Sequence, residues 1–278
     1  MGAQVVGTRQ VDKRKQARLW IGVAIACVAL LFLNKLRLDV GGVHNLFSPS
    51  YWSSRLSGAE HFNPSTRYLK SGNPAYKEVC FTFDDGPHPA SCQRILNVLK
   101  ANDVHATFFL VGLRIKQRPD LARAILADGN EVGNHTMHHP RLDTLTPDKV
   151  RQEMEDCETT FEKATNGSHM YLFRPPGERM DKAVLDTALQ MNYVTVGWQI
   201  GAKDYTGSGA DSELVEYYVL KQLKPGAIIL LHDNPITAAV LPDMIKQIKA
   251  QGYRTVMVSQ LLSHLPNPVY IQTNAHQS

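Results

Sequence analysis

Two adjacent carboxylates, Asp84 and Asp85, directly follow the apolar run 78–83. Further along the chain, His135 and His139 stand four positions apart. Side chains with this spacing share one face of a helical turn, so both imidazoles are expected to reach a single ion. Divalent metals accept imidazole nitrogen and carboxylate oxygen, and a catalytic metal keeps one position open for water. The residue types therefore predict metal-assisted hydrolysis, in which the remaining carboxylate takes a proton from the water.

Each pair also has an ordinary structural explanation. The sequence Asp-Asp-Gly-Pro is a common turn at the end of a strand, and a histidine pair can be an accident of the surface. Their joint occurrence favours the metal site. His138 lies between the two histidines and points elsewhere on such a turn, so it is left outside the site.

Three further reactive side chains, Arg174, Asp204 and His232, also lie at or just past the ends of candidate strands. His232 ends the apolar run 227–231 and suits a general acid, which Asp204 can orient and stabilise. The guanidinium of Arg174, held between rigid prolines, can bind a carboxylate. The alternatives are a core histidine, a loop aspartate and a surface arginine. The common placement at strand ends is typical of barrel enzymes.

Strands and helices alternate from residue 76 onward, which predicts the α/β class with a parallel sheet, open or closed as a barrel. The expected strands are 78–83, 106–111, 131–133, 171–173, 193–198, 227–231 and 254–258. The expected helices are 91–101, 119–127, 147–164, 181–191, 211–222 and 237–250.

The net charge of +4 is concentrated at the N-terminus, because residues 1–18 hold five basic side chains and one acidic one. The remainder is formally neutral, which argues against a nucleic-acid partner. Residues 19–33 carry no charge and span about 22 Å as a helix, and Lys35 can extend the span to the far interface. We interpret 19–35 as an uncleaved transmembrane signal anchor, with a cytoplasmic N-terminus and an extracytoplasmic catalytic domain.

A cleaved signal peptide, a lipid-attached Cys27 and a buried core helix are the alternatives to the anchor. A linker is expected over 36–75, the catalytic domain over 76–262 and a C-terminal tail over 263–278. Cys80, Cys92 and Cys157 fit no metal or disulfide framework, and Cys80, in a strand-like run, is expected as a buried thiol. One disulfide is the alternative if the domain is exported.

The motifs occur in the order seen in one enzyme family. Thr82-Phe-Asp-Asp-Gly-Pro87, His135-Thr-x-x-His139, Phe173-Arg-Pro-Pro176, Asp204-Tyr205 and Leu230-Leu-His232 resemble those of the polysaccharide deacetylases. These are carbohydrate esterase family 4, which has the chitooligosaccharide deacetylase homology domain. The resemblance covers about residues 76–262. It implies a distorted (β/α) barrel and metal-dependent removal of N- or O-acetyl groups from polysaccharides.

The resemblance also implies a role for each motif residue. The implied metal ligands, for a divalent ion that we expect to be Zn²⁺, are Asp85, His135 and His139. Asp84 is the implied catalytic base and His232 the implied acid. Arg174 and Asp204 are their respective partners.

Two motifs depart from the family pattern. Gly177 stands where an aromatic residue is usual, although its backbone N–H can still serve the oxyanion. In the fourth motif, Gly201 replaces an aspartate and Tyr205 a tryptophan. These departures predict a substrate groove whose shape differs from that of the family.

The expected function is removal of acetyl groups, mainly N-acetyl, from a polysaccharide or oligosaccharide such as peptidoglycan or a chitin-like chain. One alternative is a membrane-anchored, non-catalytic glycan-binding pseudoenzyme. The other is an amidohydrolase acting on a small amide that is not a sugar. The glycan, the metal and the oligomeric state are left open by the sequence.

Overall fold

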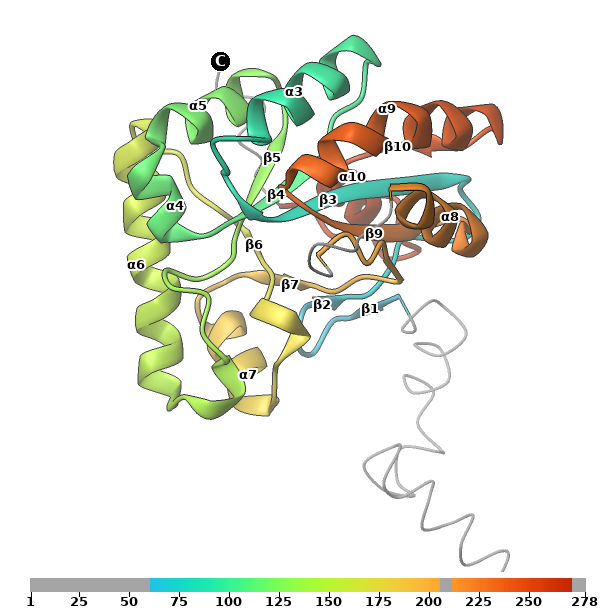
Figure 1. Ribbon diagram of the computed structural model, residues 1–278. Coiled ribbons are helices and arrows are strands. Elements are labelled where there is room, and N and C mark those ends of the chain that lie inside the picture. Colours follow the sequence, from blue (N-terminus) through green and yellow to red (C-terminus); the bar gives the residue numbers. More distant parts are fainter. Residues whose placement is uncertain (1–60, 206–211, 272–278) are drawn as a thin grey trace, which may run out of the picture. The chain divides into compact units, whose positions relative to one another are not determined.

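The computed structural model describes residues 61–205 and 212–271, all within the compact unit Ser57–Ser278 (Figure 1). The predicted basic segment, the anchor and the first part of the predicted linker lie outside these residues. Within the described ranges, no helix is long and apolar enough to cross a membrane.

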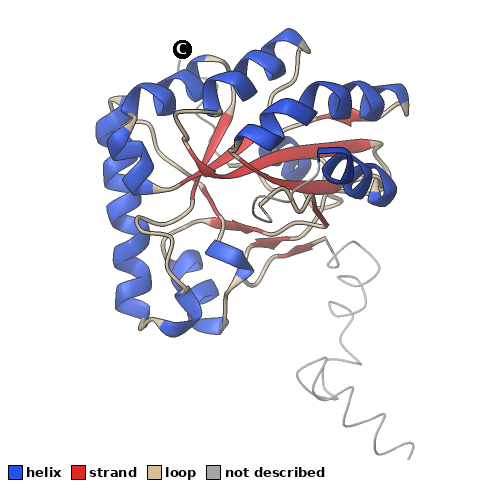
Figure 2. Cartoon of the chain, viewed as in Figure 1, coloured by secondary structure: helices blue, strands red, loops and turns tan. Residues whose placement is uncertain are grey.

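A curled sheet forms the centre of the domain (Figure 2). Within the described residues its strands are β1 (Phe62–Asn63), β2 (Tyr68–Leu69), β3 (Glu78–Gly86), β4 (Thr107–Leu110), β5 (Glu131–Asn134), β6 (Leu172–Phe173), β7 (Val194–Val196), β8 (Ile200–Gly201), β9 (Ala227–His232) and β10 (Arg254–Thr255). Their order is β1-β2-β7-β6-β5-β4-β3-β9-β8, with β10 on β3.

Only β1 and β2 pair antiparallel, and every other described pair is parallel. No described pairing joins β8 to β1. The α/β class with a parallel sheet is therefore confirmed, and the barrel is an incomplete one.

Most of the helices cover the outer side of the sheet, and α10 packs against the inner side (Figure 2). They are α3 (Cys92–Ala101), α4 (Gly112–Gln117), α5 (Pro119–Ala127), α6 (Pro147–Thr165), α7 (Lys182–Gln190), α8 (Ser212–Gln222), α9 (Pro235–Ala250) and α10 (Val258–Ser263). Short 3-10 helices lie at η2 (Leu142–Thr144) and η3 (Pro176–Glu178).

Alternation along the strands separates two hydrophobic clusters, because successive strand side chains point to opposite faces. In β3, Phe81 and Phe83 belong to the outer cluster beneath the helices, whereas Cys80 belongs to the inner cluster. The inner cluster is completed by apolar side chains of α10, including Leu261 and Leu262. A core on each face of the sheet holds the strand ends in fixed positions.

The prediction of a strand over 254–258 is wrong in its second half, where α10 begins at Val258. The start of this helix is fixed by a local bond, from the Met257 N–H to Gln260 Oε1 at 2.9 Å, and by distant partners. The Val258 N–H donates to Thr107 Oγ1 at 3.1 Å, and the Ser259 N–H donates to the buried Glu131 carboxylate at 3.3 Å. Such caps from other strands leave no local sign in the sequence.

The predicted linker is also wrong for residues 61–75, because β2 pairs with β7 and Leu69 is fully buried. Short strands of two residues are below what periodicity can detect. At the other end, part of the predicted tail packs on the domain, with Leu265 buried and the Val269 N–H bonded to Leu262 O. Cys80 is a free, buried thiol, as expected, and Cys92 and Cys157 are free and buried too.

Candidate active site

The predicted site residues gather at the carboxyl edge of the parallel strands. Asp84 and Asp85 lie at the end of β3, and His135 immediately follows β5. His232 ends β9 and is the direct register partner of Asp84 across the β3–β9 ladder. Arg174 immediately follows β6. Parallel strands end at a common edge, so residues far apart in the chain meet there.

A set of three possible metal ligands stands at this edge. Ligand atoms of Asp85, His135 and His139 all lie within 4.8 Å of one another. The Nε2 atoms of His135 and His139 are 3.5 Å and 3.2 Å from Asp85 Oδ1. Both ring nitrogens therefore face the same carboxylate oxygen, yet this buried oxygen has no hydrogen-bond partner among the described residues.

The chemistry of these ligand atoms fits a divalent metal. His135 Nδ1 lies 2.7 Å from the Arg174 carbonyl oxygen, which accepts only if Nδ1 carries the hydrogen. The Nε2 atom of the neutral ring then presents a lone pair to Asp85 Oδ1. Two acceptors facing each other in a buried site are stabilised by a cation between them, and an outer hydrogen bond of this kind commonly orients a metal-binding histidine.

Burial raises the pKa of Asp85, but the adjacent imidazoles of His135 and His139 lower it more, so the net pKa is well below its usual range. The carboxylate is therefore ionised, which is the state that a metal requires.

The expected helical turn between the two histidines is wrong. Thr136 and His139 have left-handed backbone angles, with φ of 68° and 59°, and no helix forms there. Local hydrogen bonds set this shape, because Asn134 Oδ1 accepts the Thr136 N–H at 2.8 Å and Thr136 Oγ1 accepts the His139 N–H at 3.0 Å. The rings still converge, with centroids 5.1 Å apart.

A buried polar chain supports this histidine loop, and sequence reasoning missed it. Asn134 Nδ2 donates to Met154 O at 2.8 Å and to Tyr193 Oη at 3.1 Å, and Tyr193 Oη donates to Glu158 at 2.7 Å. The asparagine side chain thus joins the loop to α6 and to the start of β7. The signal in the sequence that could have revealed it is Asn134 itself, a polar residue at the end of a buried strand.

Arg174 is fully buried and holds one oxygen of Asp84. Its Nη1 donates to Asp84 Oδ1 at 2.7 Å and to Thr82 Oγ1 at 2.8 Å. The other guanidinium nitrogens donate to the carbonyl oxygens of Val196 and Gly197. A buried cation with this many partners retains its charge. Asp84 Oδ2 is left 3.7 Å from His135 Nε2, facing the metal ligands.

Asp204 is buried against His232 and receives hydrogen bonds from several sides. Its Oδ1 lies 2.8 Å from His232 Nδ1, and its Oδ2 accepts the His232 N–H at 2.6 Å and the Thr237 hydroxyl at 2.5 Å. Burial lowers the pKa of His232, but the bond to Asp204 and the nearby carboxylates outweigh it, so the pKa is above its ordinary value of 6.5. The Nε2 atom remains available for a substrate.

A cavity of about 330 Å³ joins the two halves of the site, lined by Asp85 on one side and by Asp204, Tyr205 and His232 on the other. The Tyr205 ring meets the His232 ring edge-on, with centroids 5.1 Å apart, and is largely exposed. The aromatic side chain that replaces the family's tryptophan therefore still borders the acid.

Gly177 lies in η3 with φ of 62°. A Cβ added there would touch nothing closer than Arg179 at 3.7 Å, so the left-handed backbone, and not lack of space, favours glycine over an aromatic residue. The role of the Gly177 N–H as an oxyanion donor stays a prediction.

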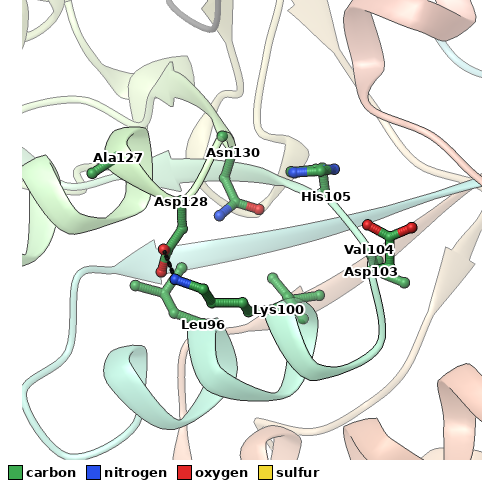
Figure 3. A pocket seen from close by; sticks show the side chains of 10 residues that line it. Leu96, Lys100, Asp103, Val104, His105, Ala127, Asp128 and Asn130 are labelled. Carbon is green, nitrogen blue, oxygen red and sulfur yellow. Dashed lines mark hydrogen bonds and ion pairs between the residues drawn. The ribbon is translucent and has the colours of Figure 1, made fainter. Parts of the chain in front are cut away.

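A second hollow, of about 350 Å³, lies at the opposite ends of β4 and β5 (Figure 3). It is bordered by the Lys100–Asp128 ion pair and by His105. It contains none of the predicted site residues.

Comparison with known proteins places this chain in a family. A family profile described as polysaccharide deacetylase matches residues 71–196, a segment that ends before Asp204 and His232. The chain is 37% identical to a peptidoglycan-N-acetylglucosamine deacetylase of Bacillus cereus, over 68% of this chain and 89% of that protein. It is 33% identical to the peptidoglycan-N-acetylmuramic acid deacetylase PdaA of Bacillus subtilis, over 69% and 73%.

A solved structure of similar fold is that of a CE4 family pseudoenzyme from Bacillus anthracis, with a TM-score of 0.67 and 29% identity. The alignment covers 74% of this chain and 71% of that one. The identity to these sequence relatives and the share of each chain that is aligned are high enough to assign the family. This chain belongs to the polysaccharide deacetylase family.

Proposed function

We propose that this chain is a metal-dependent deacetylase that hydrolyses N-acetyl groups on the amino sugars of peptidoglycan. The observation that carries the proposal is a metal-ligand set flanked by a free carboxylate oxygen on Asp84 and a free imidazole nitrogen on His232. A protein that only bound glycans would need neither of the two.

Asp85, His135 and His139 would hold the ion. Two imidazoles and one carboxylate suit Zn²⁺, which is the metal that we propose. When bound, the metal supplies Lewis acidity, which polarises the acetyl carbonyl group and lowers the pKa of water.

The protein's own groups move the protons. Asp84 accepts a proton from the attacking water at Oδ2, while Arg174 holds Oδ1 and keeps the carboxylate in place. A C–O bond forms at the acetyl carbon and the C–N bond breaks. His232 donates the Nε2 proton to the leaving amine, and Asp204 stabilises the charged imidazole at Nδ1. The Gly177 N–H is proposed to assist at the oxyanion.

Two sources support peptidoglycan as the substrate. The relatives reported above carry peptidoglycan deacetylase names. The N-terminal sequence predicts an anchored, outward-facing domain, which would meet the cell wall. We propose this location on the sequence of residues 1–35 alone. Protease treatment of intact cells that express the full chain is the test, and a domain protected from the protease would refute the location.

A pseudoenzyme is the competing function, because a relative of similar fold is one. The test is acetate release from peptidoglycan and from N-acetylglucosamine oligomers by the full chain, with and without a chelator, and with zinc added back. Zinc-restored release on either glycan is expected. No release from any acetylated glycan would favour the pseudoenzyme, and release from small acylated amines alone would favour the amidohydrolase.

A further inference from the structure

One guanidinium beside the proposed active site is without a carboxylate partner among the described residues. Arg114 extends from α4 and lines the same cavity as Asp85 and His232. It is half-buried, and its Nη1 donates to the backbone oxygen of Asp85. This hydrogen bond fixes one guanidinium nitrogen at the end of β3, and among the described residues the other guanidinium nitrogens make no hydrogen bond or ion pair.

The carboxylates that border this cavity are already engaged. Asp233 accepts the Ser91 hydroxyl at 2.6 Å and the His88 N–H at 2.8 Å. Asp204 is bonded to His232, and Asp85 belongs to the metal-ligand set. The positive charge of Arg114 is therefore not offset by an ion pair there, and a cation in a partly desolvated cavity attracts an anion.

A second donor borders the same cavity. The Nδ1 atom of His88 accepts the Ala90 N–H at 3.3 Å, so the neutral ring carries its hydrogen on Nε2. His88 and Arg114 come from different elements, the loop after β3 and helix α4. Together they give this part of the cavity hydrogen-bond donors and a positive charge.

We infer that Arg114, assisted by His88, binds a carboxylate of the glycan, so that the enzyme prefers an acetylated sugar chain bearing a free carboxylate over a neutral one. The inference rests on the proposed function. The planar guanidinium suits a carboxylate because it offers two parallel N–H donors, which a lysine cannot do. In peptidoglycan this chemistry is that of the lactyl ether after its peptide has been removed.

The test compares a peptide-free N-acetylmuramic acid-containing oligosaccharide with its methyl ester, which lacks the negative charge and carries one added methyl group. The ratio of kcat/KM for the free acid to that for the ester is measured for the zinc-loaded full chain, for Arg114→Gln and for Arg114→Lys. We expect a ratio of at least about tenfold for the unaltered chain, since a hydrogen-bonded charge contributes that much. Arg114→Gln is expected to bring the ratio near one, and Arg114→Lys to give an intermediate value.

The ratio is taken within each variant, so any general loss through the Asp85 backbone cancels. Arg118→Gln is the matched control, because Arg118 lies one turn further on and is paired with Asp120 at 2.7 Å. Its ratio should equal that of the unaltered chain. An unaltered ratio of one, or a high ratio that persists in Arg114→Gln, would overturn the inference.

Binding separates this inference from the proposed reaction. Calorimetry with Asp84→Asn measures the affinity for the free acid and for the ester without turnover. If no substrate releases acetate, the proposed function fails, yet a preference for the acid that Arg114→Gln abolishes still upholds the carboxylate site. Equal affinity for the acid and the ester would refute the carboxylate site, even if the enzyme releases acetate readily.

Discussion

Two buried charges, Arg174 and Asp204, hold the proposed base and the proposed acid in the same way. Arg174 occupies one oxygen of Asp84, and Asp204 occupies one nitrogen of His232. In each case the second atom is left to react. The cost of burying the two charges is offset by the many hydrogen bonds that each one makes.

The first prediction concerns Asp84. Asp84→Asn keeps an oxygen for Arg174 but removes the proton acceptor, so kcat should fall by roughly 100- to 10,000-fold while zinc affinity is nearly retained. Acetate release and a zinc titration on the same preparation measure the two quantities. An unchanged kcat would show that another group takes the proton.

The second prediction concerns pH. Because the pKa of His232 is raised, the protonated acid persists above pH 6.5 and kcat/KM should decline only as the pH rises through that higher value. Asp204→Asn removes the negative charge and lowers this pKa, so the alkaline limb should move to lower pH and the activity should drop about 10- to 100-fold. A pH profile with an unmoved alkaline limb would exclude His232 as the acid.

The histidine loop separates what sequence can predict from what it cannot. The spacing of His135 and His139 predicted a shared ion, and the structure brings their rings together. The prediction that a helical turn would bring them together was wrong, because two residues with left-handed backbone angles, Thr136 and His139, shape the loop. That shape depends on Asn134 and on its partners in distant elements, which no local pattern contains. The fold class, by contrast, was predictable, because the alternation of strands and helices is written in local hydrophobic patterns.

The third prediction tests the loop as an element. Thr136→Val removes the oxygen that accepts the His139 N–H, whereas Thr136→Ser keeps it. Valine has the shape of threonine, so the pair isolates the hydrogen bond. Zinc affinity should weaken by about tenfold or more in Thr136→Val and stay near the original value in Thr136→Ser. Equal affinities, measured by competition with a chelator, would show that the loop holds its shape without this bond.

At the scale of the whole domain, the sheet begins earlier than the family motifs do. Tyr68 and Leu69 add a parallel strand beside β7, and Leu69 belongs to the inner hydrophobic cluster. The predicted domain boundary at residue 76 therefore excludes residues that belong to the hydrophobic core. Two strands of two residues each were too short for any periodic pattern to reveal them.

The fourth prediction follows from this extension. A fragment of residues 76–278 lacks β1 and β2, so the edge of β7 that pairs with β2 is left unpaired. A fragment of residues 57–278 retains β2 and its pairing with β7. Losing a buried leucine alone costs about 2–5 kcal/mol, so the shorter fragment should melt at least about 5 °C lower. Thermal unfolding by circular dichroism compares the two, and equal midpoints would mean that the first strands add no stability.

The direct pairing of Asp84 with His232 across neighbouring strands has a consequence for how such enzymes diversify. The proposed proton acceptor and the proposed proton donor stand on one rung of a ladder, so strand pairing sets the separation of their backbones more than the surrounding loops do. With the proposed roles, a charge change at the rim of the cavity, such as the loss of Arg114, should alter which sugar is admitted without moving Asp84 relative to His232. Selectivity and chemistry are free to evolve on separate parts of the chain.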